Sequence, residues 1–270
     1  QAREISSARG FFSSDEPVAF FGLGKARAER LEVRWPSGRV QILTGVPDGP
    51  VLTLTEAGDT PPIEKKVPRL FRASDSLPVP HQESGFDDFA VQPLLPNRLS
   101  RQGPGQAWAD VDGDGDFDLF QGGAAGSAGR LVFNHGPDET GKPRFSEKST
   151  APFDADAACE DMGVLFLDAD RDGDEDLYVV GGGVEAAAGT VLYQDRLYFN
   201  DGQGSFTKAP FGTLPEEQDS GSCVCAADFD HDGDLDLFVG GRVHPGKYPT
   251  SPGSRLLRND GGKFSDITAG

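Results

Sequence analysis

The sequence predicts an all-β protein made of four-stranded units, with a smaller β-domain in front of them. Three observations support this fold class. One aspartate-rich pattern of nine residues occurs three times, beginning at Asp110, Asp168 and Asp228. Each copy is followed by short apolar runs, and turn-forming residues separate these runs. Regular spacing of such units indicates a repeat architecture in which every unit has the same fold.

Within each unit the elements follow one order. A first apolar run leads into the aspartate motif, and a second run (LFQGG, LYVVGGG or LFVGG) follows it. The third run begins with Arg and Leu, at Arg130, Arg196 and Arg255. An Asn-x-Gly turn then leads to a fourth run containing a phenylalanine, because Asn and Gly tolerate the positive φ of tight hairpins. These turns begin at Asn134, Asn200 and Asn259, and the phenylalanines are Phe145, Phe206 and Phe264.

The charge of the chain is concentrated in the three motifs. The 270 residues contain 44 acidic and 25 basic side chains, for a net charge of -19. The motifs hold sixteen of the acidic side chains and a single basic one, Arg171. Such a field repels phosphate backbones, which excludes nucleic acid as a partner. No apolar stretch approaches the ~18 residues of a membrane span.

A bound cation explains how so many carboxylates share short loops. Oxygen ligands at alternating positions converge on one point, and a Gly at the sixth position permits the sharp turn. The ligand positions contain no His or Cys, which disfavours zinc and copper, and Mg²⁺ prefers fewer protein ligands. An EF-hand needs Glu at the twelfth position, where this chain has Gln121, Val179 and Val239. We therefore expect about three Ca²⁺ sites, each in a β-hairpin.

The ligands are expected at alternating positions of each motif. Side chains at positions one, three, five and nine bind the metal, and position seven contributes its backbone carbonyl. The fourth-position side chains, Arg171 and His231, are expected to point to solvent. Calcium is expected to hold the hairpin together; the alternative is a regulatory or catalytic metal. The predicted ligands are Asp110, Asp112, Asp114, Asp116, Asp118, Asp168, Asp170, Asp172, Asp174, Asp176, Asp228, Asp230, Asp232, Asp234 and Asp236.

The repeats resemble a known family. The pattern Asp-x-Asp-x-Asp-Gly-x-x-Asp, followed by Leu-Phe or Leu-Tyr and a Gly pair, is similar to the FG-GAP, or VCBS, repeat of integrin α-type β-propellers. GPGQAWADVDGDGDFDLFQGG and DRLYFNDGQGSF also resemble bacterial relatives of cartilage acidic protein. The resemblance implies β-propeller blades over residues 71–270. A propeller typically needs 4 to 8 blades, so three recognisable blades indicate part of a larger propeller.

A second resemblance covers the N-terminal part. Phe21-Gly-Leu-Gly24 and Val33-Arg-Trp-Pro-Ser-Gly38 are similar to the ASPIC/UnbV domain, although Phe20 stands where the family usually has His. Leu31, Val33 and Trp35 alternate on one strand, and Val40 and Ile42 alternate on the returning strand, which predicts a hairpin with an apolar side. We assign residues 1–57 to this domain, which we expect to be N-terminally incomplete, and 58–70 to a linker.

Binding residues are expected on the connections between the second and third strands. These connections are long and irregular in the second and third units, and binding residues often lie on such loops. The alternative is packing between blades and capping of the loops. The candidate contacts with a partner are Tyr193, Asp195, Arg242, His244, Lys247 and Tyr248.

The preferred hypothesis is a non-catalytic module for adhesion, or for protein or glycan interaction, at a cell surface. Calcium sites of extracellular modules fill at near-millimolar calcium, so we expect an extracellular location with the export signal outside this chain. One alternative is an accessory or catalytic propeller of a polysaccharide-active enzyme, although no Gly-x-Ser-x-Gly or His-Glu-x-x-His motif occurs. Another is a structural subunit of a surface layer or fibre, in which further copies or segments of the same protein complete the propeller.

The three cysteines and His81 lie outside the aspartate motifs. Cys223 and Cys225 alternate on one strand and are expected on one face, inside the protein. Cys159 can pair with either of them or remain a free thiol. His81 is interpreted as a packing or surface residue.

Overall fold

The computed structural model describes residues 18–23, 26–46, 51–56, 77, 80–147 and 151–269. The chain forms two compact units, Gln1–Arg72 and Ala73–Gly270, and each is described by itself. The predicted linker at 58–70 lies outside the described residues, as does Gly24 of the Phe21-Gly-Leu-Gly24 motif. Within the described part, no helix is long and apolar enough to cross a membrane.

The first unit contains a two-stranded hairpin, β1 (Arg30–Arg34) and β2 (Val40–Thr44). The Trp35 carbonyl accepts the Gly38 amide at 2.9 Å, and Gly38 has φ 87°, which glycine adopts without strain. The predicted hairpin is therefore present, but its apolar side contains different residues of the second strand than expected. Leu31 lies opposite Leu43, while Ile42 lies opposite Glu32 and is exposed. Leu43, and not Ile42, shares the apolar side because the side-chain period of a strand is two.

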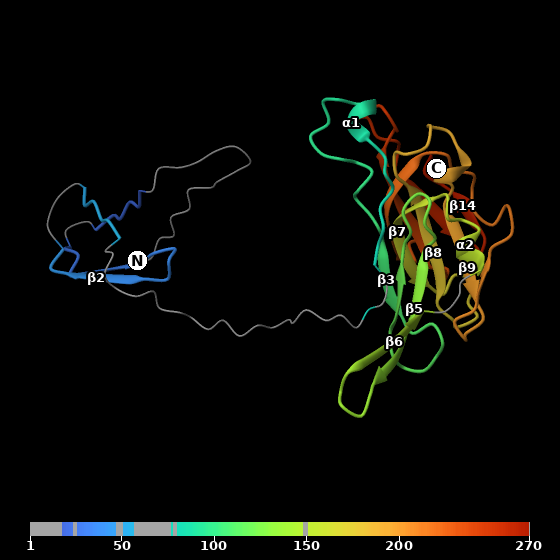
Figure 1. The fold of residues 1–270 in the computed structure, drawn as a ribbon, viewed down its shortest axis with the longest axis horizontal. Coiled ribbons are helices and arrows are strands. Elements are labelled where there is room, and N and C mark those ends of the chain that lie inside the picture. The colour runs from blue at the N-terminus through green and yellow to red at the C-terminus, as the bar shows by residue number, and fades with distance from the viewer. Residues whose placement is uncertain are drawn as a thin grey trace. The chain divides into compact units, whose positions relative to one another are not determined.

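The second unit consists of three four-stranded antiparallel sheets (Figure 1). Each sheet is a meander whose strands follow sequence order, so the prediction of four-stranded all-β units is confirmed. The first sheet contains β3 (Gln106–Ala109), β4 (Asp118–Gln121), β5 (Arg130–Pro137) and β6 (Pro143–Glu147). The second contains β7 (Glu160–Leu167), β8 (Asp176–Gly182), β9 (Arg196–Asn200) and β10 (Phe206–Lys208). The third contains β11 (Ser220–Ala227), β12 (Asp236–Val243), β13 (Arg255–Asn259) and β14 (Phe264–Asp266).

The last hairpin of the first sheet departs from the predicted pattern. The second and third sheets turn shortly after Asn200 and Asn259, as expected. In the first sheet β5 continues past Asn134 through a register shift, and Pro137 pairs with Pro143. The turn is instead held by the Asp138 carboxylate, which accepts the Thr140 and Lys142 amides at 2.8 and 3.0 Å. This aspartate-centred turn replaces the predicted Asn-x-Gly turn.

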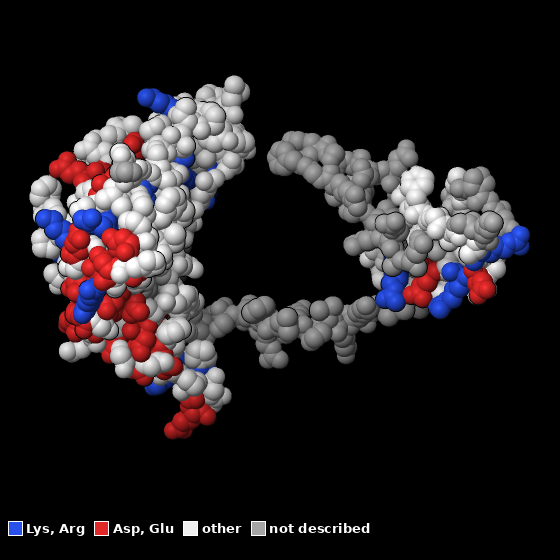
Figure 2. Space-filling view, turned by 180° about the vertical axis from the view of Figure 1, so that it is seen from behind, with Lys and Arg blue, Asp and Glu red and all other residues white. Residues whose placement is uncertain are grey.

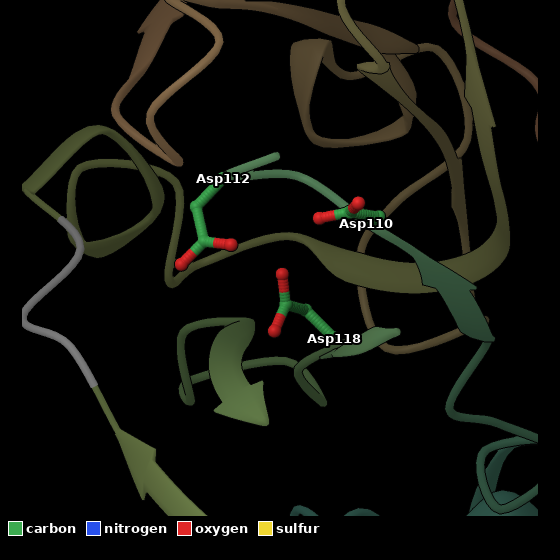
Figure 3. A group of neighbouring side chains, drawn as sticks. All are labelled: Asp110, Asp112 and Asp118. Atoms are coloured by element: carbon green, nitrogen blue, oxygen red, sulfur yellow. The ribbon is translucent and has the colours of Figure 1, made fainter. Parts of the chain in front are cut away.

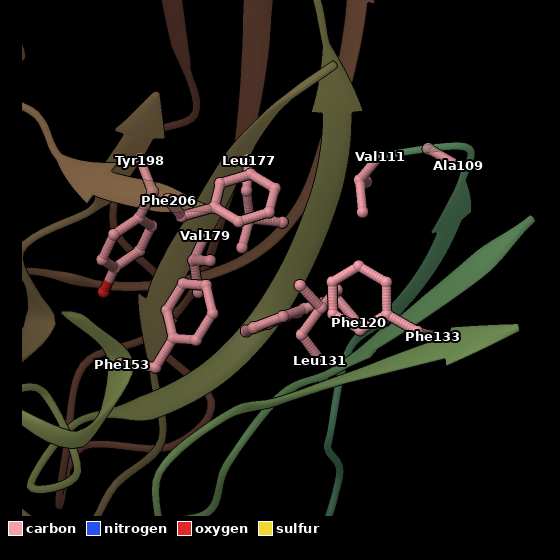
Figure 4. Close-up of a cluster of buried hydrophobic side chains, with 10 residues drawn as sticks. All are labelled: Ala109, Val111, Phe120, Leu131, Phe133, Phe153, Leu177, Val179, Tyr198 and Phe206. Atoms are coloured by element: carbon pink, nitrogen blue, oxygen red, sulfur yellow. The ribbon is translucent and has the colours of Figure 1, made fainter. Parts of the chain in front are cut away.

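Hydrophobic clusters fill the spaces between neighbouring sheets. Phe120, Leu131 and Phe133 of the first sheet pack against one face of the second, as Figure 4 shows. The other face of the second sheet, with Tyr178 and Leu197, packs against the third. Phe153 of the short helix α2 (Ala151–Asp154) contributes to the first cluster. The three sheets therefore stack in sequence order, and each sheet interface has its own core.

Two shorter elements and the cysteines complete the second unit. Helix α1 (Asp88–Val91) and the 3₁₀-helix η1 (Val191–Tyr193) lie in connections. Cys159 is buried, as a free thiol. Cys223 and Cys225 share one face of β11, but both are exposed, so the expectation that they lie inside is wrong. Val224, between them, packs into the core instead, because alternate residues of a strand point to opposite faces.

Candidate metal sites and the opposite end of the sheets

Each aspartate motif forms the connection between the first two strands of its sheet. The side chains at positions one, three and nine converge, and one carboxylate oxygen from each lies within 4.8 Å of the others. In the first loop these residues are Asp110, Asp112 and Asp118, whose carboxylates point toward one another in Figure 3. The equivalent groups are Asp168, Asp170 and Asp176, and Asp228, Asp230 and Asp236. Three oxygen-only donor sets able to hold a metal ion therefore repeat along the stack.

The ninth aspartate fixes the loop to the rest of its sheet. Asp118 is fully buried, and its two oxygens accept the amides of Val111 in the loop and Asn134 in the third strand, at 3.1 and 2.8 Å. The same pair of bonds recurs around Asp176 and around Asp236. The aspartate loop and the connection between the third and fourth strands therefore share one end of every sheet, as the alternation of an antiparallel meander predicts.

The first aspartate of each motif closes the loop through backbone amides. Asp110 accepts the amides of Gly113, Asp114 and Gly115 at 2.9 to 3.1 Å. Asp168 and Asp228 each accept one amide, from the glycine at position six, at 3.2 Å. One oxygen, Oδ1, of Asp168 and of Asp228 is buried and has no hydrogen-bond partner. A buried carboxylate oxygen without a partner is costly, so these two atoms fit the coordination of a cation.

Positions five and seven, also predicted as ligands, make different contacts. The fifth-position carboxylates of Asp114, Asp172 and Asp232 accept the amide at position seven, at 2.9 to 3.0 Å. The side chain of Asp234, at position seven, accepts the Gly261 amide at 3.0 Å and pairs with Arg171. Their side chains are therefore outside the convergent groups. Ligation by the backbone carbonyl at position seven remains a prediction.

The fourth position of each loop has left-handed backbone geometry. Gly113 occupies it in the first loop, whereas Arg171 and His231, both with φ 65°, occupy it in the others. His231 is exposed, as predicted. Arg171 is half-exposed, but its guanidinium also reaches the next loop, where Nη2 donates to the Asp232 carbonyl at 2.7 Å. Arg171 therefore connects two aspartate loops and is not purely a solvent-facing residue.

Burial and mutual repulsion raise the pKa values of four of the convergent carboxyls. Burial is the larger cause for Asp118 and Asp176, and the neighbouring aspartates add to it, so the pKa of each rises to about 6. Burial and the adjacent carboxylates also raise the pKa values of Asp170 and Asp230. Acidic side chains gather over one side of this unit in Figure 2. Such groups favour a bound positive charge.

Two of the predicted partner contacts are inside the protein. Tyr193 is buried, and its hydroxyl donates to the Ala186 carbonyl at 2.7 Å. Asp195 is buried and accepts hydrogen bonds from the Tyr178 hydroxyl, the Gly181 amide and Arg255, at 2.6 to 2.9 Å. Arg255 belongs to the next sheet, so Asp195 joins two sheets. The structure therefore favours the packing alternative for both residues and corrects their assignment to a binding surface.

The other four candidates lie on or near the connection between β12 and β13. The Arg242 guanidinium is largely enclosed and donates to the Leu99 carbonyl and to Gln102 Oε1. His244 lies 3.3 Å from Asp219, whereas Lys247 and Tyr248 are exposed. The Tyr248 backbone pairs with the Gln92 side chain near α1. His81, half-buried beside Glu83, has the packing role that was expected.

A buried ion pair and an acidic pocket at this end were not predicted. Arg196 and Asp161 are buried and lie 2.8 Å apart, and Asp161 also accepts the Gly123 amide at 2.7 Å. The neighbouring Glu160 and Glu185 line a pocket of about 150 Å³, and one oxygen of each is buried without a partner. Burial, reinforced by Glu185, raises the pKa of Glu160 to about 8. The signal for such pairs in the sequence is the arginine that begins the third apolar run of each unit.

Comparison with known protein families agrees with both parts of this architecture. Residues 1–61 match the family described as ASPIC and UnbV, and residues 184–239 match the FG-GAP-like repeat. The second match includes the third aspartate loop and its two flanking strands, β11 and much of β12. No curated protein matches the sequence. The chain therefore combines an ASPIC/UnbV region with FG-GAP-type repeats, as the sequence motifs predicted.

Proposed function

We propose that this chain, which combines an ASPIC/UnbV region with FG-GAP-type repeats, is a non-catalytic interaction module that calcium stabilises outside the cell. Its role is adhesion or the binding of a protein or glycan at a cell surface. The module is of the β-propeller type, and the calcium ions fasten the aspartate loop to the first and second strands of each sheet. Calcium acts on stability in this proposal, and the partner binds elsewhere.

The single observation that carries the proposal is the convergence of three carboxylates in each loop. Three negative groups within 4.8 Å repel one another strongly unless a cation lies between them. All the donors are oxygens, which suits a hard divalent ion. Asp168 and Asp228, which belong to two of these groups, each have a buried oxygen without a hydrogen-bond partner that can coordinate such an ion. Weak sites of this kind fill at the millimolar calcium found outside cells, which supports the extracellular assignment.

Thermal unfolding with and without calcium tests the stabilising role. At about 10 mM Ca²⁺, roughly ten times the Kd of weak extracellular sites, each site contributes about 1.4 kcal/mol, so three sites should produce a large rise in Tm. We expect Tm to fall on addition of EGTA and to recover with excess Ca²⁺ but not with equal Mg²⁺. An identical melting curve in EGTA and in about 10 mM Ca²⁺ would contradict the proposal.

Substitutions in the second loop identify the site. Asp168→Asn should remove part of the calcium-dependent rise in Tm, because one ligand charge is lost from the convergent group. Asp201→Asn is the matched control: Asp201 accepts the Gln203 and Ser205 amides in an exposed turn outside the convergent groups. Equal effects of the two substitutions on the calcium response would show that the ion does not bind at this loop.

The partner surface is tested separately from stability. Lys247 and Tyr248 are exposed, so Lys247→Ala combined with Tyr248→Ala should weaken binding to a responsive cell-surface polysaccharide or protein without changing Tm. Arg242→Ala is the contrasting variant, because its contacts with Leu99 and Gln102 are internal and its loss should lower Tm. Unaltered binding by the double variant would move the partner to another surface.

The acidic pocket supports a second candidate, an enzyme active on polysaccharides. Glu160 and Glu185 form a carboxyl pair away from the aspartate loops, and the raised pKa of Glu160 suits a general acid. However, ligand pockets usually enclose ~300 to 1,000 Å³, and about 150 Å³ is small for two sugar units. Release of reducing ends by the wild type and not by Glu160→Gln would establish this candidate. Absence of turnover across a polysaccharide panel would favour the non-catalytic module.

A further inference from the structure

The pocket beside Glu160 and Glu185 combines an apolar wall with two carboxyl groups. It lies at the end of the sheets opposite the aspartate loops and has a volume of about 150 Å³. Ala125 of the β4–β5 connection, Ala158 before β7, and Leu192 of the β8–β9 connection form part of the wall. The two glutamates are the charged residues of the lining. A ligand in this pocket would therefore contact apolar side chains and a pair of acidic groups together.

The two carboxyl groups have few partners inside the protein. Glu160 is only 3% exposed, and its Oε2 accepts the Ala125 amide at 2.6 Å. Glu185 Oε2 accepts the Val184 amide at 2.7 Å. The second oxygen of each group, Oε1, is buried and accepts no hydrogen bond from a described residue. Such oxygens are costly to bury, so both glutamates retain an acceptor for a donor that enters the pocket.

Other buried carboxylates at this end have a cation inside the protein. Asp161 lies 2.8 Å from Arg196, and Asp195 lies 2.6 Å from Arg255. In the described part of the chain, neither glutamate of the pocket forms an ion pair with an arginine, a lysine or a histidine. The pocket therefore differs from its surroundings, because the positive charge that suits its two carboxyl groups is not supplied by a neighbouring side chain.

Arg242 acts on both glutamates through its charge but is engaged elsewhere. Its Nη2 donates to the Leu99 carbonyl and, at 3.0 Å, to Gln102 Oε1. Its other terminal nitrogen, Nη1, is also buried without a partner. A water that bridges Arg242 and Glu185 is therefore the alternative to a ligand in the pocket.

A proton occupies the most buried carboxyl group when no other cation is present. The charged groups that act on Glu160 are Glu185, Glu83, Asp161 and Arg242. Burial, together with the three carboxylates, raises the pKa of Glu160 to about 8. At neutral pH this group is therefore mostly protonated. A cation that enters the pocket would displace the proton, so its binding should strengthen as pH rises through this value.

The size and the wall of the pocket restrict the kind of cation. About 150 Å³ holds roughly five non-hydrogen atoms, at on the order of 30 Å³ each. A bare Ca²⁺ suits it poorly, because Ca²⁺ takes ~6 to 8 oxygen ligands and the apolar wall supplies few. An ammonium group on a chain of about four methylenes fits better, because its carbons cover the wall and its nitrogen donates up to three hydrogen bonds.

We propose that this pocket binds a primary alkylammonium group, with Glu160 and Glu185 as the acceptors of its N–H groups. The methylene chain lies against Ala158 and Leu192. The group belongs to a lysine side chain of a protein or to a free small amine, which share this chemistry. The site goes beyond the proposed function, which leaves the chemistry of the partner open, and it does not require calcium.

Butylammonium is the probe, because it carries one ammonium group on four carbons. Butan-1-ol is the matched neutral probe, with the same carbon chain and no charge. NMR titrations that observe the probe should be run in about 10 mM Ca²⁺, so that the aspartate loops are occupied. At about pH 8.5, above the pKa of Glu160, butylammonium should bind with a Kd of about 1 to 10 mM, at least tenfold tighter than butan-1-ol. At about pH 6.5 its binding should weaken about tenfold.

Four variants separate the carboxyl groups from the enclosure and from the general charge. Glu160→Gln and Glu185→Gln should each weaken butylammonium about tenfold or more, because a charge-assisted hydrogen bond is lost, and should leave butan-1-ol unchanged. Ala158→Leu narrows the pocket without changing its charge and should weaken both probes. Glu216→Gln is the control, because it removes a charge from an exposed residue of the β10–β11 connection and should bind as the wild type does. Melting curves in calcium verify that each variant is folded.

A lysine with blocked amino and carboxyl termini distinguishes the two sources. If it binds as tightly as butylammonium, the ligand is a lysine side chain of a protein; if only butylammonium binds, the ligand is a free amine. The inference fails if the wild type binds butylammonium no better than butan-1-ol, which would leave the water between Arg242 and Glu185. It also fails if Glu185→Gln and Glu216→Gln weaken binding equally. Melting in EGTA does not involve this pocket, so the proposed function and this inference can fail separately.

Discussion

Both ends of the stacked sheets contain carboxylates, but their surroundings differ. At the loop end, three carboxylates converge in every sheet with nearly the same hydrogen bonds, and the convergent groups include no arginine. At the opposite end, Asp161 is paired with Arg196, and Asp195 with Arg255, inside the protein. Under the proposed function the loop end therefore depends on an ion from the solution, whereas Asp161 and Asp195 at the opposite end have arginine counterions within the protein.

The aspartate loops repeat one arrangement in every sheet, whereas the arginine pairs differ from sheet to sheet. The loops are local in sequence, so the same nine residues can rebuild the same site in each repeat. The arginine pairs join distant segments, and their partners differ: Arg196 pairs within its own sheet, while Arg255 reaches the preceding one and also contacts Glu217 at 2.7 Å. Calcium should consequently control the stability of one end without affecting the other.

The largest effect is expected from breaking the buried ion pair at the opposite end. Arg196→Met leaves Asp161 charged and buried, which should lower the free energy of unfolding by about 3 to 5 kcal/mol. The loss should be the same with calcium and with EGTA, as measured by urea unfolding. Arg130→Met is the control, because Arg130 pairs with Glu147 at 3.7 Å near the surface and should cost well under ~1 kcal/mol. A calcium-dependent loss in Arg196→Met would break the comparison.

The next largest effect is expected at the ninth position of a loop. Asp176→Asn retains one acceptor oxygen but turns an amide group toward a backbone N–H, which should cost about 2 to 3 kcal/mol in EGTA. The cost should increase in calcium, because a ligand charge is also lost. Asp172→Asn, at the fifth position, accepts one exposed amide and should cost less than ~1 kcal/mol. Equal losses at the two positions would remove the distinction between them.

A pH-dependent gain in stability is expected from Glu160. Burial raises its folded pKa to about 8 from an ordinary value of 4.5, so the folded protein binds more protons than the unfolded chain between these values. Stability therefore falls as pH rises through this window. Glu160→Gln should remove that fall, with a gain of about 1 to 3 kcal/mol at pH 8.5 and almost none at pH 4.5. Chemical unfolding at the two pH values measures it, and a constant difference would contradict the assignment.

The smallest effect is expected from the arginine that links two loops. Arg171→Ala removes half-exposed contacts with Asp232 and Asp234, which should cost about 0.5 kcal/mol. The exposed His231→Ala, at the equivalent position of the next loop, should have no measurable effect on the melting temperature. Similar losses for both would show that the left-handed position, and not the ion pair, determines the effect.

The sequence was sufficient to predict the features that are local. The repeated motifs located the four strands of each sheet, and positions one, three and nine of the loops converge as the alternating carboxylates suggested. The motifs could not predict whether Cys223 and Cys225 are buried or exposed, because alternation places them on one face of the strand without identifying that face. Their face is the outer one, since Val224 faces the second sheet.

Features that depend on long-range packing were not predictable from the motifs. Tyr193 and Asp195 lie in a connection of the kind that often binds ligands, yet both are buried. Asp195 accepts a hydrogen bond from the guanidinium of Arg255, which lies 60 residues further along the chain. The β5–β6 hairpin also differs from the predicted Asn-x-Gly turn, because Asp138 offers a competing turn after Asn134. Tertiary contacts and a second turn signal decided these three cases.

The consecutive order of strands within each sheet has a consequence for how the protein forms. Every strand pairs with its nearest neighbour in the sequence, so the backbone contacts of a sheet have low contact order. Each sheet can assemble as soon as its own sixty or so residues are available, on the pattern of repeat proteins that propagate from unit to unit. The aspartate loop lies between the first two strands, so under the proposed function metal capture can precede completion of the sheet during synthesis.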